Sequence, residues 1–301
     1  MSTDDGRYQP PYEMNKKLTF PLNLTFALIY IFTGDFSGTP SNLKHGAGVF
    51  TWASGDSYEG GWSNDLQHGR GSYNYASGSK YTGNYVDGLM HGRGRYTSSA
   101  GDVYNGDFAN DKKHGTGRYT WVSGDSYEGS YFEDKKQGQG RYNHSVSGEE
   151  YSGEWLQDKK QGHGCCKYAS GDMYTGEVAD GVPHGYGLYQ YANGLVYEGY
   201  FKSGLQDGQG TASYPNGSVY TGFFKCGQMH GKGLFTRSDG SVYDGDYVMG
   251  RMEGVGTYRW PNGDSYTGAF KDDCRNGRGT KTYAMGATKT GLWAMDAYVE
   301  P

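Results

Sequence analysis

Proline and cysteine are scarce in this sequence, and their scarcity excludes two classes of protein. Only 8 of the 301 residues are proline, and no Gly-x-y triplet persists, so a collagen helix is excluded. The four cysteines show no C-x-x-C spacing, and the vicinal pair Cys165 and Cys166 suits neither an ordinary disulfide nor a zinc knuckle. We therefore expect a reducing compartment, in the cytoplasm or its cytoskeleton.

Long apolar runs and an excess of one charge are also missing. Residues 18–32 come nearest to a membrane or export signal, but Pro21 and Asn23 interrupt them. They fall short of the roughly 20 apolar residues of a membrane helix, and no small-residue cleavage pattern follows them. The 28 lysines and arginines nearly balance the 33 acidic residues. We expect no secretion, no transmembrane segment and no nucleic-acid partner.

Glycine and tyrosine, in contrast, are abundant. The chain holds 53 glycines and 30 tyrosines. Glycine inside a strand or helix costs roughly 0.5–1 kcal/mol relative to alanine, so this excess needs a structural reason. Aromatic residues make up 16% of the chain, whereas disordered segments are poor in them. The glycines must therefore serve a regular, folded backbone.

One unit repeats along the chain with a period of 23 residues, lengthened to 24 at a single step. Its first mark is an aromatic-x-Gly triplet, with a second aromatic residue usually four positions after the first, as in Tyr58, Gly60 and Trp62. Positions i, i+2 and i+4 share one face of a β-strand. The first aromatic residue falls at Phe32, Tyr58, Tyr81, Tyr104, Tyr127, Tyr151, Tyr174, Tyr197, Tyr220, Tyr243 and Tyr266.

A polar turn and a G-x-G pair follow in each unit, and the pair begins a second alternation, as in Tyr73 and Tyr75. No segment keeps the 3.6-residue apolar period of a helix. We therefore predict an all-β fold, an elongated single twisted antiparallel sheet (solenoid) of about 11–12 consecutive β-hairpin repeats. The expected domains are an N-terminal extension with an apolar capping strand at 1–31, the repeat array at 32–293 and a C-terminal tail at 294–301.

The repeated unit, typified by Tyr58-Glu59-Gly60-Gly61-Trp62 and then His68-Gly69-Arg70-Gly71, resembles the MORN repeat (membrane occupation and recognition nexus). The resemblance covers roughly residues 32–293. The resemblance implies consecutive antiparallel hairpins. Because repeats fill nearly the whole sequence, the chain most resembles the free-standing scaffolds of the family, such as the radial spoke head and other axonemal MORN proteins. Other members of the family are membrane-associated proteins, kinases and a methyltransferase.

Lysine pairs at the same turn of three successive units are the first candidate site. Their spacing predicts an edge of positive charge that would bind an acidic partner or an anionic lipid headgroup, but an aspartate precedes each pair, and solvated turns are the alternative. The six residues are Lys112, Lys113, Lys135, Lys136, Lys159 and Lys160.

The segment before the first repeat is the second candidate site, because both of its faces are apolar. It comprises Phe26, Ala27, Leu28, Ile29, Tyr30 and Ile31. Either the first 20 residues of the chain cover it, or it contacts a partner or a second copy of the chain in a homodimer.

Several units lack an aromatic residue after G-x-G, and these positions are a third feature. Cys166, Ala212 and Lys281 replace the aromatic residue at the first position after G-x-G, and Ser98, His144 and Arg237 replace it at the next. They indicate either local thinning of the aromatic stack or places that a partner's side chain fills.

No residue is predicted to act in catalysis or to bind a cofactor or metal. The histidines of H-G-x-G recur in successive hairpins, roughly 9–10 Å apart, whereas zinc ligands each lie about 2 Å from a common ion. Serine, histidine and acidic residues recur as repeat positions and form no unique constellation.

The sequence therefore predicts a non-catalytic structural scaffold that mediates protein–protein contacts. We expect it in a ciliary or flagellar axoneme complex such as the radial spoke head, with other proteins of that assembly as partners. The alternative is a membrane-associated scaffold that binds anionic phospholipids or the cytoskeleton at a membrane. A weaker alternative is a regulatory subunit that positions a separate enzyme.

Overall fold

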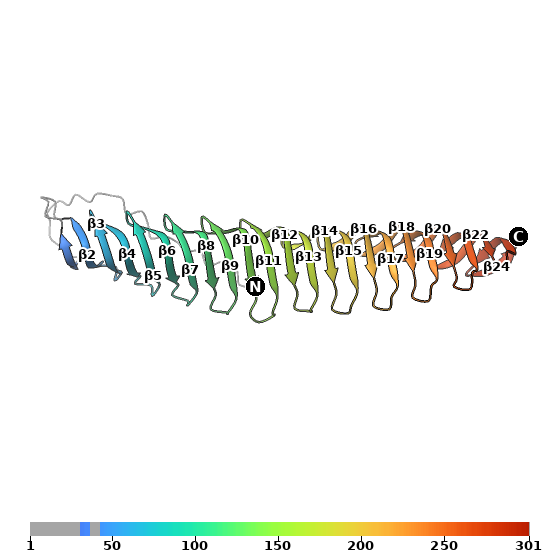
Figure 1. Ribbon diagram of the computed structural model, residues 1–301, viewed down its shortest axis with the longest axis horizontal. Helices are drawn as coiled ribbons and strands as arrows, with labels where there is room; N and C mark the ends of the chain where they lie inside the picture. Colours follow the sequence, from blue (N-terminus) through green and yellow to red (C-terminus); the bar gives the residue numbers. More distant parts are fainter. Residues whose placement is uncertain (1–30, 37–42, 301) are drawn as a thin grey trace. The chain divides into compact units, whose positions relative to one another are not determined.

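The computed structural model describes residues 31–36 and 43–300, and within them every regular element is a β-strand. The chain divides into two compact units, Met1–Lys135 and Lys136–Pro301. In each unit, successive strands are antiparallel neighbours that lie side by side in sequence order (Figure 1). The predicted all-β fold of consecutive hairpins is confirmed.

The first unit contains β1 (Ile31–Phe36), β2 (Lys44–Thr51), β3 (Ser57–Ser63), β4 (Leu66–Asn74), β5 (Lys80–Val86), β6 (Leu89–Thr97), β7 (Val103–Ala109), β8 (Lys112–Thr120) and β9 (Ser126–Phe132). Strand β10 (Lys135–Asn143) begins at the boundary between the units.

The second unit continues with β11 (Glu150–Leu156), β12 (Lys159–Lys167), β13 (Met173–Ala179), β14 (Val182–Gln190), β15 (Val196–Lys202), β16 (Leu205–Ser213), β17 (Val219–Lys225), β18 (Gln228–Thr236), β19 (Val242–Val248), β20 (Arg251–Arg259), β21 (Ser265–Lys271), β22 (Cys274–Thr282), β23 (Thr288–Ala294) and β24 (Ala297–Glu300). Strand β24 lies in the segment predicted as a C-terminal tail.

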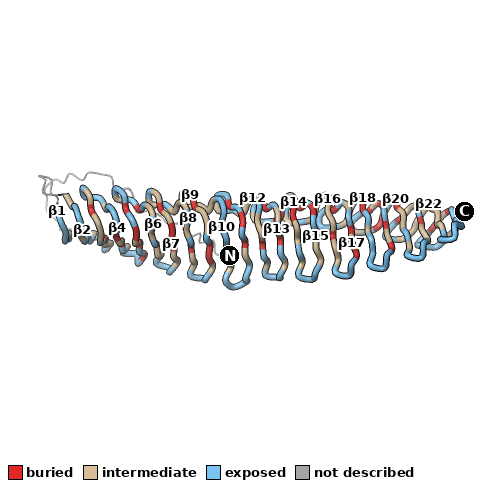
Figure 2. The backbone as a smooth tube through the Cα atoms, viewed as in Figure 1, coloured by how far each residue is buried: buried red, intermediate tan, exposed pale blue. Residues whose placement is uncertain are grey.

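The two faces of the sheet differ sharply, and we call them the aromatic face and the polar face. Along the first strand of most hairpins, buried aromatic positions alternate with more exposed ones (Figure 2). The first aromatic residue of each full repeat, from Tyr58 to Tyr266, is at most 1% exposed. Residues next to it in sequence point to the polar face, because side chains alternate along a strand.

The glycines of the repeat make room for these tyrosines. In the second full repeat, the ring of Tyr81 lies over Gly83 of its own strand and Gly94 of the next, and its hydroxyl donates to the Asn84 carbonyl oxygen at 3.1 Å. A Cβ atom added at either glycine would fall 2.6 Å from Cζ of this ring. The aromatic-x-Gly and G-x-G motifs are therefore two halves of one packing unit, a ring and the bare backbone beneath it.

Two-residue turns with positive φ close the hairpins. Asn110 and Asp111, with φ values of 51° and 67°, show the type I′ geometry that matches the twist of paired strands. The Asp111 carboxylate also accepts a hydrogen bond from the Met90 backbone N–H at 2.8 Å, and Asp134 accepts one from Lys113 at the same distance. Each such aspartate, which we call a turn aspartate, thus fixes its own turn to the preceding hairpin.

The apolar segment from Phe26 to Tyr30 lies outside the described residues, so its proposed capping or dimer role stays a prediction. Of the six residues of this candidate site, Phe26 to Ile31, only Ile31 is described, and its backbone pairs with Thr51 in β2. No helix within residues 31–36 and 43–300 has the length and apolarity needed to cross a membrane.

Candidate partner-binding pocket

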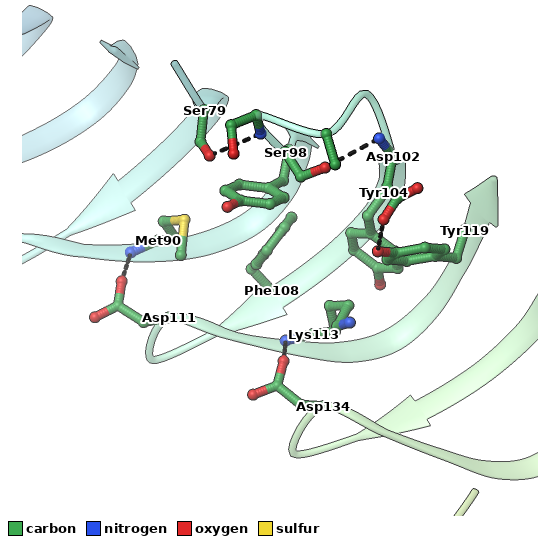
Figure 3. A pocket seen from close by; sticks show the side chains of 13 residues that line it. Ser79, Met90, Ser98, Asp102, Tyr104, Phe108, Asp111, Lys113, Tyr119 and Asp134 are labelled. Atoms are coloured by element: carbon green, nitrogen blue, oxygen red, sulfur yellow. Dashed lines mark hydrogen bonds between the residues drawn. The ribbon is translucent and has the colours of Figure 1, made fainter. Parts of the chain in front are cut away.

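A pocket opens on the aromatic face of the first unit where the repeat lacks a ring. In neighbouring repeats, Trp52 packs against Tyr73 and Tyr75 against Tyr96, with ring centroids 5.2 and 6.4 Å apart. By the same spacing, a ring at position 98 would pack against Tyr119. The residue there is Ser98, and the space that it leaves belongs to a cavity of about 270 Å³ (Figure 3).

The inner surface of the pocket is aromatic and aliphatic. Met90, Tyr104 and Phe108 line it and are at most 5% exposed. The ring centroids of Tyr104 and Phe108 lie 5.1 Å apart in an edge-to-face arrangement. Tyr96 and Tyr119 complete the lining. The pocket therefore presents the kind of surface that buries an apolar or aromatic side chain.

Polar groups form the rim, and most are held in place by hydrogen bonds (Figure 3). Ser98 Oγ accepts the backbone N–H of Asp102 at 3.0 Å, and Ser79 Oγ accepts that of Ser99 at 3.0 Å. The Asp102 carboxylate accepts the Tyr119 hydroxyl at 3.1 Å and the Val122 N–H at 2.8 Å. These contacts join three consecutive repeats and hold the rim side chains in place.

The Lys113 ammonium group and the carboxylates of Asp111 and Asp134 lie on the side of the pocket next to the hairpin turns. Lys113 Nζ lies over the Tyr119 ring, 4.9 Å from its centroid, in a cation–π contact. Asp111 and Asp134 line the same side. Burial raises the pKa of Asp111 above its ordinary value; the Met90 N–H opposes this shift and the charge of Asp134 adds to it.

The raised pKa of Asp111 predicts a pH dependence of stability with a defined sign. The folded state holds this proton more tightly than the unfolded state, so the contribution of Asp111 to stability falls as the pH rises through its folded pKa. Asp111→Asn should therefore be more stable relative to the wild type at pH 7 than at pH 4. Urea titrations at both pH values measure the difference.

Asp246 provides a control of opposite sign. Its ion pair with Lys232, 2.8 Å long, lowers its pKa, so its stabilising contribution is lost as the pH falls through that pKa. Asp246→Asn should lose stability at pH 7 and converge with the wild type in acid. Equal slopes for the two variants would contradict the assignment.

The two lysines of each predicted pair point to opposite faces of the sheet, because adjacent residues of a strand alternate. That they bind an anionic partner stays a prediction. Lys113, Lys136 and Lys160 lie on the aromatic face, each over at least one ring. The preceding lysines alternate to the polar face, where Lys112 pairs with Glu133 at 3.4 Å and Lys159 with Asp180 at 2.8 Å. Lys135, the last residue of the first unit, directly precedes the ring-facing Lys136 in the same strand. By the same alternation it points to the polar face.

The aspartates beside these lysines have a role that sequence reasoning missed. They were expected to weaken the positive edge, whereas Asp134 and Asp158 accept the backbone N–H groups of Lys113 and Lys136 at 2.8 and 2.9 Å. The recurring x-Asp turn is the signal that could have revealed this contact. In the described part of the chain, no group of three or more His, Cys, Asp or Glu residues could hold a metal ion.

Comparisons with known proteins agree with the repeat period. The family model for the MORN repeat matches eleven segments: 41–57, 58–80, 81–103, 104–126, 127–144, 151–173, 174–196, 197–219, 220–242, 243–265 and 266–288. No curated protein matches the chain.

Solved structures with a similar arrangement include the TCP10 domain of Danio rerio CPAP in complex with a peptide of STIL. Its identity is 11%, its TM-score 0.39, and the match covers 76% of this chain and 97% of that one. The TCP domain of Drosophila melanogaster SAS-4, in complex with a proline-rich motif of Ana2, is 13% identical with a TM-score of 0.32. That match covers 60% of this chain and 85% of that one.

Proposed function

Because the chain belongs to the MORN-repeat family, whose repeats are typical of scaffolds that bind proteins or membranes, we propose that it is a non-catalytic scaffold for other proteins of a large assembly. MORN-repeat proteins are generally not enzymes. The observation that carries the proposal is the pocket at Ser98, because it interrupts the aromatic stack with a preformed cavity. A side chain from a partner protein, aromatic in character, would restore the packing that neighbouring repeats achieve with their own rings.

The assembly that we propose is a ciliary or flagellar axoneme complex such as the radial spoke head. The support for this step is the sequence resemblance to the free-standing axonemal members of the family. The test is fractionation of cells that carry the endogenous protein. It should remain with detergent-extracted microtubule axonemes and leave them only under salt or denaturant. Complete release by mild detergent would contradict the axonemal location and favour the membrane-associated alternative.

Ser98→Tyr tests the pocket without threatening the fold, since tyrosine is the residue that Tyr75 and Tyr191 supply at the same position. The new ring should fill the cavity, keep or raise the unfolding midpoint, and reduce retention on extracted axonemes at least fivefold. Ser238→Tyr is the matched control, because it adds the same ring at an exposed position of another repeat. Unchanged retention of Ser98→Tyr would remove the pocket from the proposed function.

A further inference from the structure

A groove crosses strands β4 to β7 on the polar face of the first unit, opposite the pocket. Its volume is about 640 Å³. The backbone of Gly83, Gly94 and Gly106 forms its floor, and two rows of outward-pointing side chains form its walls. Arg70, Asn84 and Arg93 belong to one wall; Thr82, Arg95 and Asn105 belong to the other.

The charge of this groove is not compensated in the way that other cations on the same face are. Arg118 lies opposite Glu128 in the adjacent strand, 3.9 Å away, and Lys232 lies opposite Asp246 at 2.8 Å. In the groove, neutral side chains stand opposite two of the three arginines, Arg70 and Arg95.

Arg70 lies opposite Asn84, and Arg95 lies between Thr82 and Asn105. Within residues 31–36 and 43–300, neither arginine forms an ion pair; in contrast, Arg93 pairs with Asp107 at 2.8 Å. Two exposed guanidinium groups, one on each wall, are therefore available to a ligand.

Similar grooves elsewhere on this face have a different chemistry. In the second unit, one of about 370 Å³ is lined by Glu154 and His163, and another of about 300 Å³ by Tyr186, Glu198 and Tyr200. The backbone geometry is common to the repeats, so the side chains on the walls decide what each groove accepts. The arginine groove is the basic one among these.

The spacing of the two arginines favours an extended acidic peptide. Arg70 and Arg95 lie on strands β4 and β6, which are two strands, or about 9–10 Å, apart. In an extended chain, residues three apart are separated by about 10 Å and point to opposite sides. An acidic residue followed by another three positions later therefore directs one carboxylate to each wall, where guanidinium groups bind carboxylates in a bidentate fork.

We infer that the arginine groove binds an extended segment of a partner protein that carries acidic residues three positions apart. A flat membrane surface fits less well, because the walls recess the floor between them. Nucleic acid is also disfavoured, since Glu59 and Asp107 lie on the same face and the chain is acidic overall, with a net charge of −5. The inference rests on the scaffold function but uses the face opposite the pocket.

The test uses the full chain and a fluorescein-labelled peptide of four Glu-Ser-Ser repeats, followed by fluorescence anisotropy. We expect saturable binding that weakens as salt is raised, and no binding of the same peptide with glutamine in place of glutamate. Arg70→Gln combined with Arg95→Gln should weaken binding at least tenfold. Arg259→Gln combined with Arg278→Gln removes the same charge from exposed positions of the polar face in the second unit and should change it less than twofold.

Several results would overturn the inference. These are failure of the wild-type chain to bind the peptide at low salt, equal weakening in both double variants, or binding of phosphatidylserine vesicles or single-stranded RNA in place of the peptide. The unfolding midpoint of each variant verifies its fold. Ser98→Tyr should leave peptide binding unchanged, so failure of the pocket and failure of the groove are distinguishable.

Discussion

Tyr104→Ala is expected to lower the free energy of unfolding of its part of the sheet by about 3–5 kcal/mol, the cost of removing a large buried ring. Tyr104 is 1% exposed, and its ring centroid lies 5.1 Å from that of Phe108 and 5.2 Å from that of Tyr131. The ring thus joins its own hairpin to the next.

Hydrogen exchange is the measurement of choice, because in repeat proteins each unit contacts only its neighbours and unfolding can be local. The amides of β6 to β9 should lose protection, whereas those of β19 to β22 should keep theirs. Tyr104→Phe is the matched control: it removes only the hydroxyl, which donates to the Asp107 carbonyl oxygen at 3.0 Å, and should cost about 1 kcal/mol. Equal losses for the two variants would show that the ring itself contributes little.

Gly94→Ala is expected to destabilise the fold by about 2–3 kcal/mol, although alanine is ordinarily better than glycine in a strand. The new Cβ would fall 2.6 Å from Cζ of Tyr81, whose ring is completely buried and cannot move aside without displacing Tyr85 and Phe108. Denaturant unfolding followed by aromatic fluorescence would report the loss.

A double-mutant cycle identifies the cause of that loss. If the clash with Tyr81 is responsible, Gly94→Ala should cost much less in a Tyr81→Leu background, giving a coupling energy of more than about 1 kcal/mol. Gly88→Asp is the comparison that should leave the free energy of unfolding nearly unchanged. Aspartate already occupies the equivalent turn position at Asp111, with φ of 67°. Additive effects of the first two substitutions would contradict the ring-over-glycine explanation.

The fold was predictable because the pattern of each strand is local and is repeated. Tyr58, Gly60 and Trp62 at alternate positions define one face of a strand, and the 23-residue period places the next copy beside it. The sequence alone also shows that Ser98 stands where the neighbouring repeats have an aromatic residue. Its consequence, a cavity shared by Met90 and Phe108, required the neighbouring repeats to be placed next to it.

Two other features could not be predicted because they depend on contacts between repeats. The turn aspartates bind backbone groups about 21 residues earlier, as Asp111 does with Met90, and no local pattern reports that distance. The arginine groove depends on which neutral residues lie opposite Arg70 and Arg95, and hence on the register of three strand pairs. The opposite directions of the two lysines in each pair follow from strand alternation alone, which the expectation of one positive edge left out.

The turn aspartates also make the two long edges of the sheet unequal in their tolerance of added sequence. The repeat with 24 residues places its extra residue in the opposite loop, where the His144 N–H donates to the Glu149 carbonyl oxygen one position later than in the usual loop from Tyr168 to Asp172. At the turn edge, Asp158 still accepts the Lys136 N–H at 2.9 Å, now across 22 residues. A fluorescent tag or cross-linking peptide is therefore best inserted between His144 and Glu149, where the loop already holds one residue more than the usual loop.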